Sequence, residues 1–179
     1  MRSSAMQDLV VPTPGLWAVD ADASTVAFSV RHIGAATVRG RFERFEGWLD
    51  IGRDGTAAAG GWVDVASIDT GIALRDRALR SRGCFDAARH PRAAFEARAA
   101  AGRDEFAVDG ELTIMGRRRP LELRGDARTA RSRQLSLIVT GQISRRDFRL
   151  DWSNLLNGGV AIVSDRVSIR LDLTLRLRP

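Results

Sequence analysis

The feature that most constrains this chain is a strict alternation of apolar and polar residues near its C-terminal end. Every second position of this stretch is apolar and the positions between are polar or charged, the apolar set being Val167, Ile169, Leu171, Leu173, Leu175 and Leu177. Successive side chains of a β-strand point to opposite faces, whereas a helix would scatter these leucines around its circumference. The stretch therefore predicts a long antiparallel strand with one buried face and one face in water.

The same period of two recurs along most of the chain from Leu16 onward. Further apolar rows include Val26 to Val30, Phe106 to Ile114 and Leu135 to Val139, and glycine-rich turns at 52–55, 101–104, 115–118 and 157–159 separate the rows. This pattern corresponds to about eight strands, which close on themselves to remove exposed edges. We therefore predict an all-β fold, an antiparallel eight-stranded barrel.

One segment breaks the alternation. Residues 70–81 predict a cap followed by about two helical turns, with Leu74 and Leu79 on the apolar face. A second short turn at 86–89 is ended by Pro91, because the residue before a proline avoids the helical region. We expect this helical insert to lie over one end of the barrel as a lid.

The interior of such a barrel is either filled by its own side chains or hollow enough for one small ligand. Gly40, Gly47 and Gly110 fall on inward rows, where they should leave space, and this favours a cavity. The alternation also changes parity at Glu43-Arg44, which predicts a bulge or a tight bend.

The length of 179 residues fits one domain, with residues 1–14 as a flexible N-terminal segment and 15–179 as the barrel. No signal peptide is recognisable, and no apolar run reaches the roughly 20 residues of a membrane span. The single cysteine, Cys84, fits a reducing compartment and is interpreted as a small buried side chain. We therefore expect a cytoplasmic protein without an integral membrane segment.

The net charge of +6 invites a nucleic-acid or anionic-membrane interpretation. All 28 basic residues are arginine, however, which is typical of codon bias in a GC-rich genome. They are scattered, mostly on the polar rows of strands, so no nucleic-acid partner is expected. A basic barrel that binds RNA or another polyanion remains as an alternative.

The sequence gives little support for a metal site or a catalytic site. Two histidines and one cysteine offer no pair at metal-ligand spacing, and no Gly-x-Ser-x-Gly elbow occurs. We expect no enzyme, no metal and no cofactor. The doublet Arg75-Asp76 either lines the mouth of a cavity or pins the helical insert to the barrel rim.

The order and spacing of many residues resemble the YceI-like family of lipocalin-like, polyisoprenoid-binding proteins. The match rests on Trp17 to Asp20, Phe28, Gly40 to Phe42, Ser67 to Thr70, Arg75-Asp76, Leu79 to Ser81, Phe85-Asp86, Pro91, Phe95, Gly110 to Thr113, Arg145, Asp147-Phe148 and Asp165. The resemblance implies an extended barrel around a hydrophobic tunnel for an isoprenoid-like chain, often in a homodimer. It implies carriers or stores of lipid or quinone, without catalysis, many of them periplasmic.

Our leading hypothesis is non-enzymatic binding, storage or transport of a long-chain isoprenoid-like lipid or quinone. The predicted cavity lining is Phe28, Val30, Phe42, Phe45, Leu74, Leu79, Phe85, Phe95, Leu112, Ile114, Phe148 and Val167. His32, Arg75 and Asp76 form the predicted polar rim. Besides the polyanion binder, a filled-core interaction module with an outward tryptophan remains open.

Overall fold

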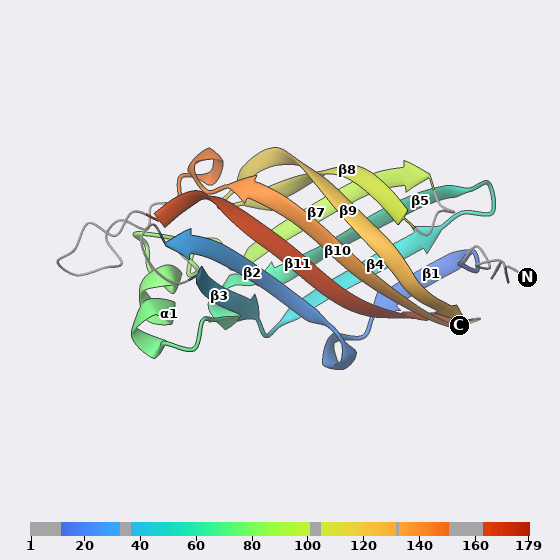
Figure 1. Cartoon of the computed structure of the whole chain (residues 1–179), viewed down its shortest axis with the longest axis horizontal. Coiled ribbons are helices and arrows are strands. Elements are labelled where there is room, and N and C mark those ends of the chain that lie inside the picture. The colour runs from blue at the N-terminus through green and yellow to red at the C-terminus, as the bar shows by residue number, and fades with distance from the viewer. Residues whose placement is uncertain (1–11, 33–36, 101–104, 132, 151–162) are drawn as a thin grey trace, which may run out of the picture.

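Strand β11 (Val163–Leu177) confirms the long strand predicted from the C-terminal alternation. Val167 and Leu175 are buried, and the apolar residues between them on the same face are half-buried. The computed structural model describes residues 12–32, 37–100, 105–131, 133–150 and 163–179 (Figure 1). The predicted turns at 101–104 and 157–159, and most of the predicted flexible segment, lie outside these residues.

The remaining strands follow in chain order as β1 (Gly15–Val19), β2 (Thr25–His32), β3 (Thr37–Phe42), β4 (Phe45–Ile51), β5 (Thr56–Asp64), β6 (Ile68–Asp69), β7 (Arg92–Ala100), β8 (Glu105–Ile114), β9 (Arg117–Arg131) and β10 (Gln134–Ser144). The helical elements are η1 (Ala21–Ala23), η2 (Val65–Ser67), α1 (Ala73–Arg80) and η3 (Arg146–Phe148). No helix in the described ranges is long and apolar enough to cross a bilayer.

The sheet closes through β11. One edge of β11 pairs with β10, and its other edge pairs first with β2 and then with β1. From β1 the sheet continues through β4, β5, β7, β8 and β9 back to β10. Three pairs of strands lie end to end, and each pair forms one interrupted strand of the barrel: β1 with β2, β3 with β4, and β5 with β6. Counted in this way, eight antiparallel strands surround the axis. The predicted eight-stranded all-β barrel is confirmed.

The three interruptions are local bends of neighbouring strands. The predicted parity change at Glu43-Arg44 is the bend between β3 and β4. It is fastened to η2, since the Arg44 amide donates to the Ser67 hydroxyl at 3.0 Å and that hydroxyl donates to the Asp64 carbonyl at 2.7 Å. Phe42 before the bend and Phe45 after it can therefore both face the interior.

The interior holds two clusters of buried apolar residues. A small cluster at the end near the chain termini comprises Trp17, Ile51, Leu135 and Leu175, all at most 5% exposed. The Trp17 indole N–H donates to the Thr13 carbonyl at 2.9 Å, which satisfies its polar atom. The larger cluster occupies the rest of the barrel and extends to α1 through Leu79.

Helix α1 is shorter than the predicted 70–81 segment and lies at the end of the barrel opposite β1 and the C-terminal end of β11 (Figure 1). Leu79 is buried, but Leu74 is 70% exposed, so the expectation that Leu74 closes the barrel is wrong. Leu79 in the second turn of the helix packs in the larger core cluster, whereas Leu74 in the first turn faces solvent. The predicted turn at 86–89 is confirmed by bonds from the Arg89 and His90 amides to the Asp86 carbonyl.

Candidate functional site: an apolar cavity inside the barrel

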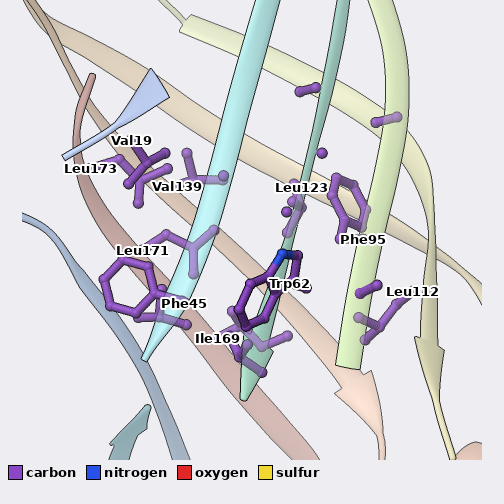
Figure 2. Close-up of a pocket in the computed structure, with 18 of the residues that line it drawn as sticks. Val19, Phe45, Trp62, Phe95, Leu112, Leu123, Val139, Ile169, Leu171 and Leu173 are labelled. Carbon is purple, nitrogen blue, oxygen red and sulfur yellow. The ribbon is translucent and has the colours of Figure 1, made fainter. Parts of the chain in front are cut away.

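A cavity of about 340 Å³ lies inside the barrel. Inward side chains of every strand except the two-residue β6 contribute to its wall, as shown for Val19, Phe45, Leu112, Leu123 and Leu171 in Figure 2. Its volume is within the range of ligand pockets, at the lower end. The interior is therefore hollow, against the filled-core alternative.

The wall is apolar almost throughout. Among the described lining residues Glu46 alone carries a charge, and its side chain is exposed on the polar row of β4. Trp62 also borders the cavity, and the guanidinium of Arg92 lies 3.8 Å from its ring centroid. Such a wall offers dispersion contacts and exclusion from water, and it supplies no array of polar groups for a reaction.

Phenylalanine rings cover several inward glycines. A Cβ atom on Gly40 would lie 2.7 Å from Cε1 of Phe28, and one on Gly110 would lie 2.6 Å from Cε2 of Phe95. The expectation that these glycines leave space open is therefore wrong, because neighbouring rings occupy it. Gly47 itself borders the cavity, and a Cβ atom there would lie 2.9 Å from the side chain of Val19. The cavity lies beyond the rings, which form its wall.

Most of the predicted lining residues meet at this wall. Eight of the twelve border the cavity, namely Phe28, Phe42, Phe45, Phe85, Phe95, Leu112, Ile114 and Val167. Val30, Leu79 and Phe148 are each 2% exposed and pack in the larger cluster without bordering the cavity, which corrects their predicted place. Leu74 is the fourth exception.

The lining prediction also omitted residues of the later strands. They include Leu121, Leu123, Leu137, Val139, Ile169, Leu171 and Leu173. Leu137, Val139 and the residues of β11 belong to the apolar rows of the alternating pattern, which could have placed them on the inner face. The prediction favoured aromatic residues, although the wall of a barrel takes inward residues from all its strands.

The predicted rim doublet braces the start of the helical insert. Asp76 is 6% exposed and accepts hydrogen bonds from the Thr70 amide at 2.9 Å and from the Thr70 hydroxyl. Arg75 donates to the same hydroxyl at 2.7 Å and to the Thr70 carbonyl at 2.9 Å. Neither residue borders the cavity, so the pinning interpretation fits these contacts. The side chain of His32 lies outside the described part.

None of the described carboxylates with a shifted pKa borders the cavity. A hydrogen bond from Arg176 lowers the pKa of Asp20. For Asp165, burial raises the pKa, but hydrogen bonds from Ser144 and the Arg146 amide outweigh it and the pKa is lowered. Neither carboxylate borders the cavity. In the described ranges, no three residues of the types His, Cys, Asp and Glu are grouped so that they could hold a metal ion.

Comparison with known proteins assigns the chain to a family. The YceI-like domain matches residues 17–175. The chain belongs to the YceI-like family. This confirms the resemblance found in the sequence.

Curated relatives of this YceI-like chain match over part of their length. A UPF0312 protein of Vibrio cholerae is 29% identical over 123 residues, which are 66% of this chain and 62% of the relative. Protein YceI of Escherichia coli O157:H7 is 31% identical over 101 residues, 55% of this chain and 53% of that protein. The chain thus aligns with less than two thirds of the length of these relatives.

Solved structures share the fold of this YceI-like barrel. BcnA of Burkholderia cenocepacia has a TM-score of 0.75 at 23% identity, covering 87% of this chain and 98% of BcnA. A polyisoprenoid binding domain from Saccharophagus degradans has a TM-score of 0.72 at 19% identity, covering 90% and 98%. At these identities the likeness concerns the architecture.

Proposed function

We propose that this YceI-like barrel binds a long-chain apolar molecule, an isoprenoid-like lipid or a quinone tail, and stores or carries it without chemical change. The apolar cavity inside the barrel is the observation that supports this function. The description of the Saccharophagus degradans neighbour as a polyisoprenoid binding domain points to the same ligand class.

The cavity is large enough for useful affinity. Each methylene removed from water contributes about 0.8 kcal/mol. About ten methylenes therefore match the roughly 8 kcal/mol of micromolar binding before the cost of ordering the chain is subtracted. A volume of 340 Å³ accommodates one such chain, with a polar head group outside the apolar wall.

Mass spectrometry of solvent extracts from the purified protein tests the proposal, followed by titration with a fluorescent polyprenyl or quinone probe. Ala59 borders the cavity and its chain neighbour Ala58 does not, which provides a matched pair of sites on β5. Ala59→Phe should weaken probe binding at least about tenfold by filling the cavity, and Ala58→Phe should leave it unchanged. Protein that carries no apolar molecule and binds no probe would contradict the proposal.

We also propose that the carrier works in the cytoplasm, in line with the single cysteine, and that it forms a homodimer, in line with the family resemblance. Cell fractionation and light scattering test these two points separately. Polyanion binding is the competing function, and a gel shift across a salt series distinguishes it because counterion release gives a steep dependence on salt.

A further inference from the structure

The start of α1 presents an apolar tip to solvent. Ile72 is 52% exposed and Leu74 is 70% exposed, and the flanking Gly71 and Ala73 are exposed as well. Exposed single hydrophobic residues are ordinary, but four consecutive apolar residues at a protruding end are not.

The tip is held in place by its neighbours. The Asp76 amide donates to the Ile72 carbonyl at 3.0 Å, and the Asp76 side chain accepts from the amide of Thr70 at 2.9 Å. Arg75 binds the carbonyl of Thr70 at 2.9 Å. Arg75 and Asp76 thus brace the turn from which Ile72 and Leu74 project.

The surroundings of the tip are strongly basic. Segment 69–92 contains six arginines and three aspartates, a net charge of +3 out of +6 for the whole chain. Asp69 accepts from the Gly71 amide at 2.9 Å, and its charge is paired with Arg41 at 3.0 Å. Asp76 and Asp86 are buried, whereas five of the six arginines are exposed. Among the described residues, Arg77 and Arg82 take part in no ion pair. Arg77 follows Leu74 by three positions and so shares its face of the helix.

We propose that this tip, residues 71–74 with the arginines that follow, docks on an anionic lipid bilayer. Apolar side chains flanked by arginine are the combination that binds the interface of such a membrane, where the apolar groups enter the acyl boundary and the cations meet the phosphates. The cytoplasmic leaflet carries the required negative potential. Phe85, which borders the cavity, belongs to the same segment, so docking brings that end of the cavity next to the bilayer.

Other occupants fit less well. Nucleic acid would call for exposed aromatic side chains that stack on bases, and Phe85, the only aromatic side chain in segment 70–92, is 7% exposed. A stable protein interface buries about 800 Å² on each partner, more than two apolar side chains provide. A bilayer needs only a few inserted side chains.

Vesicle co-sedimentation tests the docking. Wild-type protein should bind vesicles of phosphatidylcholine and phosphatidylglycerol in equal parts at least about tenfold more tightly than pure phosphatidylcholine vesicles, and salt should weaken this binding. Ile72→Ser with Leu74→Ser, and separately Arg77→Glu with Arg82→Glu, should each lower it at least about fivefold. All substituted side chains are exposed, and thermal melts verify that the variants remain folded.

Matched controls lie away from this tip. Leu16→Ser replaces an apolar side chain that is 43% exposed on β1, and Arg53→Glu with Arg178→Glu reverses two exposed charges. Both controls should bind vesicles like the wild type. Equal losses in control and tip variants, no preference for anionic vesicles, or binding to a single-stranded oligonucleotide in place of vesicles would overturn the docking. The vesicles contain no cavity ligand, so failure of docking is distinct from failure of the proposed lipid binding, which the Ala59→Phe titration reports.

Discussion

The ring of Phe28 on β2 lies over the backbone of Gly40 on β3. The two residues are direct partners in the antiparallel register, and a Cβ atom on Gly40 would lie 2.7 Å from Cε1 of the ring. The same ring stands 5.7 Å from the ring of Phe42, centroid to centroid. An absent side chain on one strand therefore decides where an aromatic side chain of the next strand forms the cavity wall.

Replacing Gly40 by Ala should displace the Phe28 ring or the neighbouring Thr70 methyl group, which lies 2.9 Å from the added carbon. Such overpacking costs about 1–3 kcal/mol of unfolding free energy. Chemical denaturation measures the loss. Gly83→Ala is the control, because its nearest atom is 3.7 Å away, and it should change stability by no more than about 0.5 kcal/mol. Equal stabilities of the two variants would contradict this account of the glycine.

Replacing Asp76 by Ala should unfasten the helical insert from Thr70. The change removes the acceptor of the Thr70 amide and hydroxyl in a site where Asp76 is 6% exposed, at a cost of about 1–3 kcal/mol. Relative to the wild type, hydrogen exchange in the variant should become faster in α1 and stay unchanged in β9–β11. Asp109→Ala, at an exposed position on β8, is the control that should leave exchange unchanged. Unaltered protection of α1 would indicate that the other contacts of the insert, such as Leu79 in the core and the bonds from Arg75 to Thr70, hold it without Asp76.

The pair of Arg44 and Asp64 should make stability depend on pH. Burial raises the pKa of Asp64, but hydrogen bonds from Arg44 and the Ala66 amide outweigh it and the pKa is lowered. A folded-state pKa below the unfolded value of about 3.9 stabilises the fold above pH of about 4, and the contribution is lost as pH falls through the lower folded value.

Asp64→Asn should therefore lower the melting temperature at pH 7 and lose this effect at strongly acidic pH. The expected loss at neutral pH is about 0.2–1 kcal/mol, because the Arg44 side chain is 61% exposed. Calorimetry across pH checks the sign. An effect of equal size at pH 7 and in strong acid would attribute the loss to packing instead of ionisation.

Replacing Leu135 by Ala should lengthen the cavity at the end near the termini. Leu135 is 1% exposed, borders the cavity and packs in the cluster with Trp17 that ends it. The loss of a buried leucine costs about 2–5 kcal/mol, and part of the new space should accept additional carbons of a ligand. Affinities for a series of polyprenols or fatty alcohols of increasing length should shift toward longer chains. Leu16→Ala, on the exposed face of β1, should not alter the preferred length.

The alternation of β11 was sufficient to predict which of its residues face the interior, because side-chain direction along a strand follows from local geometry. The same local rule located the bend at Glu43-Arg44, and the proline at position 91 located the end of the turn before it. Family membership could also be inferred from the order of residues alone. None of these conclusions requires knowledge of the neighbouring strand.

Tertiary structure alone decided which inward residues border empty space. Phe28 and Val30 share one face of β2, yet Phe28 borders the cavity and Val30 packs into the core, because pairing across strands places a glycine opposite the first and Val38 opposite the second. Leu74 has the periodicity of a core residue and is exposed, whereas Leu79 of the same helix packs in the larger cluster. Sequence period reports the direction of a side chain, whereas what lies in that direction depends on residues distant in the chain.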